Sequence, residues 1–199
     1  MKKLLCIVGS MNTGGAETLL MKIYRHLDRS RYQIDFCVAS PGKYDSEIQQ
    51  LGGNILFTVP KSSGPVKAFC SIRKIVRHQH YKYVLRVSQN ALSSMELLAA
   101  RCGGATRTIF RSSNSNTCGN RVDLILHKLF MPLARAVSDV QIAPSTEAAD
   151  FMFGHNSVIS GRAFLLHNGI DLNVYRFDPQ ARAEIRRSLA IGEHTLVFG

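Results

Sequence analysis

Short apolar runs alternate with longer amphipathic stretches along the chain, and this alternation predicts a parallel sheet. The apolar runs have the length of buried strands, and the stretches between them place apolar residues at helical spacing. The predicted strands are 4–9, 33–39, 54–59, 82–87, 106–111, 138–143 and 163–167, and the predicted helices are 15–28, 45–51, 65–79, 91–102, 121–136 and 145–154. This order favours an α/β fold with a Rossmann-like parallel sheet and helices on both faces.

The first predicted strand leads through Gly9–Gly15 directly into a helix. Gly14 and Gly15 would let the backbone approach a ligand closely, because neither carries a Cβ. The free N–H groups at the start of the helix would point at an anion. Gly14 and Gly15 are therefore candidates for contact with a phosphate. The alternative is that they only form a tight strand-to-helix turn.

Two better-known phosphate motifs do not fit this loop. A P-loop needs lysine and Ser/Thr after its last glycine, and Gly15 and Ala16 stand there instead. A dinucleotide fingerprint needs an acidic residue at the end of the second strand, which here ends on Ser40. The sequence therefore disfavours an NTPase and an NAD-dependent enzyme.

Three stretches resemble signatures of one enzyme family. Gly9–Thr18 is similar to the N-terminal signature of the retaining glycosyltransferases of family 4, and His167–Asp171 is similar to the "NGID" stretch of that family. Phe177–Leu189 resembles the lead-in to its second domain. The resemblance implies the N-terminal domain of a GT-B enzyme. Residues 1–167 would form the acceptor-side Rossmann-like domain, and 168–199 the linker and the beginning of the donor-binding domain.

The resemblance also implies an activity. Such an enzyme transfers a sugar from a nucleotide-sugar donor to a polar acceptor, and the role of the family in bacterial surface polysaccharides points to a lipid-linked glycan. The chain alone is expected to be inactive, because the donor would bind mainly to the other domain. The nucleotide-sugar is a co-substrate, and no separate cofactor or metal is expected. Two alternatives stay open: a non-catalytic glycan- or lipid-binding module, and another Rossmann-type nucleotide-dependent enzyme.

Ligands of parallel α/β sheets bind where loops follow the carboxyl ends of the strands. Hydroxyl and amide groups suit sugar hydroxyls, and the arginine fork suits phosphate. The acceptor-binding candidates in these loops are Arg86, Ser88, Gln89, Arg111, Ser112, Asn114, Ser145 and Thr146.

Each group of candidates has a simpler alternative. Arg86, inside a strand, could be neutralised on a helix-covered face, and the polar loop after Arg111 could be merely flexible. Ser145 could be only a helix N-cap. Many relatives carry histidines at two of these strand ends where this chain has none, so no catalytic residue is assigned. His127 and His155 are expected on helices, at the surface.

The formal net charge is +11, which calls for an anionic partner or a solvated basic surface. Nucleic acid is disfavoured, because no recognised binding motif accompanies the basic residues. The helices 65–79 and 121–136 combine basic and apolar residues, which suits peripheral binding to an anionic membrane. The alternative is that both are ordinary amphipathic helices packed on the sheet.

The five cysteines include no C-x-x-C pair, which makes a zinc site unexpected. Cys6 and Cys37 lie in predicted strands and should be buried, whereas Cys118 lies in a polar loop and should be the most reactive. No apolar stretch approaches the length of a membrane span, and the N-terminus has the pattern of a core strand instead of a signal peptide. We therefore expect a cytoplasmic protein, peripheral at the inner face of the cell membrane if it binds lipid.

Overall fold

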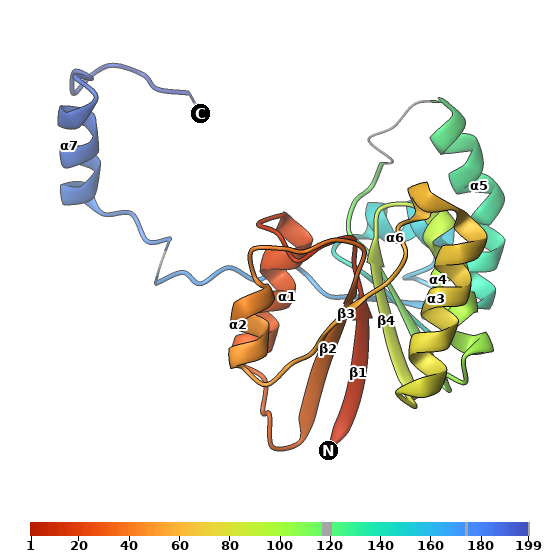
Figure 1. The fold of residues 1–199 in the computed structure, drawn as a ribbon. Helices are drawn as coiled ribbons and strands as arrows, with labels where there is room; N and C mark the ends of the chain where they lie inside the picture. Colours follow the sequence, from red (N-terminus) through yellow and green to blue (C-terminus); the bar gives the residue numbers. More distant parts are fainter. Residues whose placement is uncertain (117–120, 174, 199) are drawn as a thin grey trace. The chain divides into compact units, whose positions relative to one another are not determined.

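Seven strands form one sheet in the order β3-β2-β1-β4-β5-β6-β7 (Figure 1). The computed structural model describes residues 1–116, 121–173 and 175–198. Every neighbouring pair of these strands is parallel. The strands are β1 (Lys2–Ile7), β2 (Tyr32–Val38), β3 (Ile55–Phe57), β4 (Tyr83–Ser88), β5 (Arg107–Ser112), β6 (Val140–Ala143) and β7 (Ala163–Leu165).

Helices connect the strands, and the prediction of a Rossmann-like α/β fold is confirmed. The helices are α1 (Gly15–Arg25), α2 (Asp45–Gln50), α3 (Pro65–His78), α4 (Ser94–Cys102), α5 (Arg121–Ala136), α6 (Thr146–Phe153) and α7 (Pro179–Ser188). Two 3-10 turns, η1 (Lys61–Ser63) and η2 (Ala91–Ser93), precede α3 and α4. The predicted helix 91–102 therefore begins with a 3-10 turn.

The two faces of the sheet carry separate cores. On β1, Leu5 and Ile7 point into the core formed with α3 to α6, whereas Cys6 and the next residue after the strand, Val8, point into the core formed with α1 and α2. The period of two along a strand produces this division. Figure 1 shows α1 and α2 on one side of the sheet and α3, α4 and α5 on the other. The strand order reverses between β1 and β4. In sheets of this kind, ligands bind in the crevice outside the carboxyl ends of the strands at that point.

The cysteines fit the cores as expected. Cys6 and Cys37 are buried, and burial raises the pKa of each thiol to about 12, so both behave as small hydrophobic groups. Cys118 lies outside the described residues, so its expected reactivity stays a prediction. None of the helices among the described residues is both long and apolar enough to cross a bilayer.

The contacts divide the chain into two units, Met1–Asn168 and Gly169–Gly199. The second unit contains α7, a helix absent from the predicted set. Asp178 accepts hydrogen bonds from the N–H groups of Gln180 and Ala181, and Pro179 occupies the first helical position. This Asp-Pro start is a recognisable N-terminal signal. The helix escaped prediction because its sequence is mostly polar.

Candidate ligand site at the carboxyl edge of the sheet

The β1–α1 loop is held in place by the loop that follows β2. The N–H of Tyr44 donates to the Met11 carbonyl at 2.9 Å, and the N–H of Lys43 donates to Asn12 Oδ1 at 3.1 Å. Gly42 lies so close that an added Cβ would stand 2.5 Å from the Met11 oxygen. Gly42 thus allows the two loops to meet. Sequence reasoning missed it, although a Pro-Gly pair is a turn signal.

Gly14 and Gly15 differ in their surroundings. Gly14 is the extended N-cap of α1, and a Cβ on it would collide with the carboxylate of Glu17. A Cβ on Gly15 would meet no atom within 4 Å. The Glu17 carboxylate therefore lies beside the positive end of the helix dipole. A phosphate binding at this helix start would have to displace that carboxylate, whereas the space over Gly15 is open.

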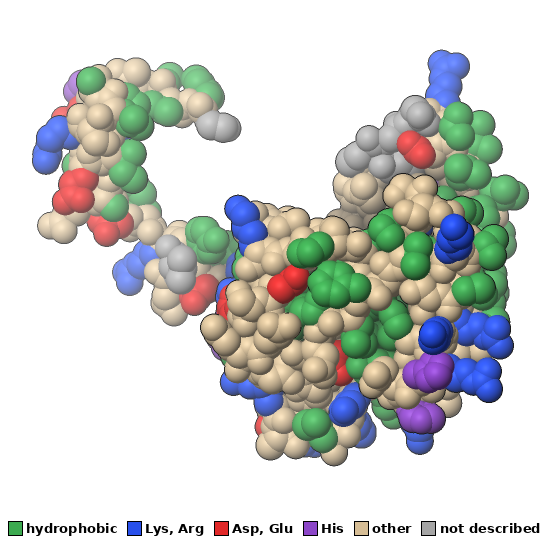
Figure 2. Space-filling model, viewed as in Figure 1, with side chains coloured by type: hydrophobic (Ala, Val, Ile, Leu, Met, Phe, Trp, Pro, Cys, Tyr) green, Lys and Arg blue, Asp and Glu red, His purple; other side chains and the backbone are tan. Residues whose placement is uncertain are grey.

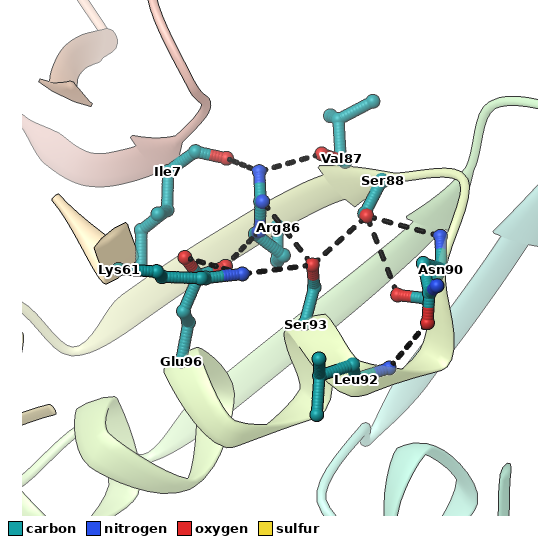
Figure 3. Close-up of polar contacts among 9 residues, drawn as sticks. All are labelled: Ile7, Lys61, Arg86, Val87, Ser88, Asn90, Leu92, Ser93 and Glu96. Carbon is teal, nitrogen blue, oxygen red and sulfur yellow. Dashed lines mark hydrogen bonds and ion pairs between the residues drawn. The ribbon is translucent and has the colours of Figure 1, made fainter. Parts of the chain in front are cut away.

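Arg86 belongs to the interior (Figure 3). Its Nη1 donates to the carbonyls of Ile7 at 3.0 Å and Val87 at 2.7 Å, and its Nη2 donates to Ser93 Oγ at 3.2 Å. Its Nε forms an ion pair with Glu96 on α4. All three nitrogens are thus engaged on the helix-covered face. The structure does not bring Arg86 to the ligand-facing edge with the other candidates.

A second cation shares the Glu96 carboxylate. Lys61 Nζ lies 3.1 Å from Glu96 Oε1 and donates to Ser93 Oγ at 3.3 Å (Figure 3). Burial lowers the pKa of Lys61, and the Glu96 carboxylate opposes that effect. One carboxylate therefore pairs with two basic groups, one from η1 and one from β4. No sequence spacing signals this cluster, because its members come from separate elements.

Most polar groups of the loop after β4 form hydrogen bonds within that loop. Ser88 Oγ donates to Ser93 Oγ at 2.9 Å and accepts from the Asn90 N–H at 3.1 Å. Gln89 is exposed beside it. Of the predicted residues in this loop, Gln89 is therefore the better placed to contact a ligand.

Arg111 has a different environment from Arg86, because it points to the opposite face of the sheet. Its side chain is buried, with the residue 4% exposed, and Nη2 donates to Asn168 Oδ1 at 2.6 Å. Its Nε has no hydrogen-bond partner among the described residues. Burial lowers the pKa of the guanidinium, and no acidic group contributes to that shift. Arg111 is therefore a buried cation whose Nε–H can still donate a hydrogen bond.

The segment after β7 completes this part of the edge. His167 Nδ1 lies 2.8 Å from the Pro144 carbonyl at the end of β6, and the next residue, Asn168, binds Arg111. Two stretches that are distant in the sequence thereby meet at one edge of the sheet. Asn168 was known only as part of a motif, and its contact with Arg111 could not be read from the sequence.

The remaining candidates lie around Arg111 and β6. Ser112 is buried and its Oγ donates to the Asn114 carbonyl at 3.1 Å, while the Asn114 side chain accepts from the Ser115 N–H at 2.8 Å. Ser145 caps α6 by accepting from the Ala148 N–H at 3.3 Å, and Thr146 is exposed. The cap explains Ser145 without a ligand.

The expectation that His127 is a surface residue is wrong. His127 lies on α5 but is 1% exposed. Its ring stacks on the ring of Phe151, with 4.0 Å between the two ring centroids. Nδ1 accepts from the Ala91 N–H at 3.1 Å, so Nε2 carries the proton and donates to the Phe151 carbonyl at 2.9 Å. A neutral imidazole therefore joins α5, η2 and α6. His155 is exposed, as expected, but lies beyond the end of α6.

Comparisons with known proteins agree with this architecture. No family model matches the chain. The chain is 31% identical over its whole length to a Bacillus subtilis (strain 168) protein named "Putative glycosyltransferase EpsF", and it spans 53% of that protein. The chain thus covers about half of this curated relative.

Solved structures share the fold. The Anabaena protein Alr3699/HepE, solved in complex with UDP-glucose, matches 96% of the chain with a TM-score of 0.67 and 18% identity, and the match covers 50% of HepE. The UDP-GlcNAc 2-epimerase of Methanocaldococcus jannaschii matches 96% of the chain with a TM-score of 0.57 and 15% identity, over 54% of its own length. At such identities the likeness shows the fold alone. The chain therefore has a Rossmann-like α/β fold that proteins of different named activities share.

The neutral state of His127 predicts a pH dependence of stability. Burial lowers its folded-state pKa below the ordinary 6.5. The unfolded chain therefore binds more protons, and stability falls as the pH drops below about 6.5. His127→Gln should remove the part of the pH dependence of stability that comes from this imidazole. It should also cost about 1–3 kcal/mol, because one backbone group loses its partner.

Urea unfolding of the chain at neutral and mildly acidic pH tests this prediction. The matched control is His78→Gln, which changes an exposed histidine at the end of α3 and should leave both stability and its pH dependence unchanged. An unaltered pH dependence in the His127→Gln variant would refute the role assigned to the imidazole.

Proposed function

We propose that this chain is the acceptor-side half of a retaining glycosyltransferase of family 4. The enzyme moves a sugar from a nucleotide-sugar to a polar acceptor, a lipid-linked glycan of a bacterial surface polysaccharide. The 31% identity to the relative named "Putative glycosyltransferase EpsF" supports the transferase class. The complex of HepE with UDP-glucose supports a nucleotide-sugar as the donor.

The observation that carries the proposal is Arg111 at the carboxyl edge. A buried guanidinium without an acidic partner is costly unless an anion or a set of polar acceptors completes it. Asn168 holds one end of the Arg111 guanidinium through Nη2, and Nε has no hydrogen-bond partner among the described residues. The guanidinium can therefore donate to a phosphate oxygen of the donor or of a phosphate-linked acceptor. Gln89 and Asn114 supply amide groups for sugar hydroxyls, and the buried Ser112 supports this loop through its hydrogen bond to the Asn114 carbonyl.

The proposed chemistry is stabilisation of charge on the leaving group. The bond from the anomeric carbon to the donor diphosphate breaks, and negative charge grows on the diphosphate. The acceptor oxygen bonds to the anomeric carbon, and its proton passes to the departing diphosphate or to water. Preorganised donors aimed at the growing charge are the main source of rate in such a step. Arg111 and the open backbone at Gly15 are the groups of this chain that we assign to it, and no catalytic acid or base is assigned.

We further propose that residues 168–199 link this half to the donor-binding half. Many of their apolar side chains are exposed, including Leu172, Phe177 and Ile185. Such surface normally packs against other protein. The chain alone should therefore show no measurable turnover with UDP-sugars and a polyprenyl-linked glycan. Its coding sequence should continue into a second Rossmann-like domain.

Two results would contradict this domain assignment. One is robust sugar transfer by the purified chain of 199 residues. The other is a stop codon directly after Gly199 in the gene, which would favour a non-catalytic glycan- or lipid-binding module. The fold likeness to an epimerase keeps a second enzyme class in view, and analysis of the products distinguishes epimerised nucleotide-sugar from transferred sugar.

The open space over Gly15 predicts a selective loss of activity. Gly15→Val in the longer enzyme should lower transfer at least about tenfold, or roughly 1.4 kcal/mol of barrier, while the melting temperature stays within a degree or so. Gly42→Ala is the contrasting variant, because its Cβ meets the Met11 backbone and should lower the melting temperature instead. Full activity in Gly15→Val would mean that Gly15 serves only the turn.

Arg111→Lys tests the proposed site most sharply, since lysine keeps the charge and loses the planar fork. We expect kcat/KM to fall at least about tenfold at an unchanged melting temperature. Arg107→Lys, at the exposed start of the same strand, is the matched control and should keep wild-type kinetics. Wild-type kinetics and stability in Arg111→Lys would remove Arg111 from the mechanism, and loss of folding would assign it to structure.

A further inference from the structure

Helix α5 presents apolar residues to solvent as well as to the core. Phe130, Met131 and Leu133 are partly buried and pack against the core. Val122, Ile125 and Leu129 face outward and are 60%, 65% and 68% exposed. These three residues follow helical spacing and form one line, which we call the α5 stripe. Packing on the sheet accounts for the inner face of α5 and leaves the α5 stripe unexplained.

Basic residues border the α5 stripe. Arg121, Lys128 and Arg135 recur at every seventh position, so they lie along one edge of the stripe, and all three are exposed. The acidic residue of the helix, Asp123, is only partly exposed. Figure 2 shows hydrophobic side chains gathered over α5, with Lys and Arg side chains around them. The helix thus joins an apolar surface to positive charge.

A groove of about 690 Å³ lies on the same side of the sheet as α5. It lies between the start of α3 and η2–α4, and its walls include Val66, Phe69, Leu92 and Met95. Turn η2 packs against α5, where the Ala91 N–H donates to His127. Lys61 and Glu96 form an ion pair at the end of the groove, and Glu96 also pairs with Arg86. The groove is therefore an apolar slot next to η2, on the same side of the sheet as α5.

Helix α3 adds positive charge without any acidic residue. Its exposed side chains include Lys67, Arg73, Lys74 and Arg77, and α3 lies with α4 and α5 on one face of the sheet (Figure 1). By contrast, the apolar residues Phe69, Ile72, Ile75 and Val76 of α3 pack inward, so ordinary helix packing explains them. Apart from the residues that line the groove, helix α3 contributes mainly positive charge to this face.

We propose that this face docks on an anionic lipid bilayer. The α5 stripe enters the interface between head groups and acyl chains, the α3–α4 groove receives hydrocarbon, and the basic residues of α3 and α5 bind lipid phosphates. The charge of the face matches an anionic leaflet and argues against a second copy of this basic chain as the occupant. The proposal does not depend on sugar transfer.

Flotation of the chain with vesicles tests the proposal. Phosphatidylcholine vesicles containing about one-third phosphatidylglycerol should bind the chain, and pure phosphatidylcholine vesicles should not. The variants Ile125→Gln/Leu129→Gln and Arg121→Gln/Lys128→Gln should each weaken binding roughly tenfold or more without changing the melting temperature, because all four side chains are exposed.

Two matched controls separate this face from general effects. Lys2→Gln/Lys3→Gln makes the same change of charge at the start of β1, and Ile159→Gln removes an exposed apolar side chain elsewhere. Both should bind as wild type. No binding to the anionic vesicles, or equal loss in the controls, would overturn the proposal. So would a dimer in sedimentation equilibrium that Ile125→Gln/Leu129→Gln dissociates, because a second copy would then cover the stripe.

Discussion

The Arg86–Glu96 ion pair connects the elements around the boundary between β1 and β4, where the strand order of the sheet reverses. Arg86 lies on β4 next to β1, binds the last carbonyl of β1, and reaches Glu96 on α4 and Ser93 on η2. A charge placed in this core would be very costly alone, and removal of one partner of such a pair typically costs about 3–5 kcal/mol. Lys61 draws η1 into the same cluster. The elements that shape the crevice are thereby tied to one carboxylate.

Arg86 and Arg111 lie on neighbouring strands but differ in their surroundings, because only Arg86 has an ion-pair partner among the described residues. Arg86 pairs with Phe110 across the strands, whereas Arg111 pairs with Val87, so the two side chains leave the sheet on opposite faces. Arg86 has an acidic partner and every nitrogen engaged. Arg111 has only the neutral Asn168 and a free Nε among the described atoms. The internal pair stabilises the edge, and Arg111 is the cation left for a ligand.

Periodicity predicted the seven strands and the helices of the first unit, because most of the apolar patterns coincide with buried residues. The contacts at the edge were harder. Arg86 was a ligand-binding candidate with neutralisation on a helix-covered face as the alternative, because alternation along a strand does not reveal which face is covered by a helix that carries a carboxylate. His127 was misjudged although it shares the inner face of α5 with Phe130 and Ala134, so helical spacing carried the signal. Gly42 and Asn168 matter through contacts between distant segments, which no local pattern contains.

The division between the two arginines can be measured directly by NMR of the guanidinium Nε–H groups in the ¹⁵N-labelled chain, titrated with inorganic pyrophosphate. The account predicts that the Arg111 signal shifts with saturation while the Arg86 signal stays in place and exchanges slowly with solvent. A shift of the Arg86 signal, or an Arg111 signal that ignores pyrophosphate, would contradict it.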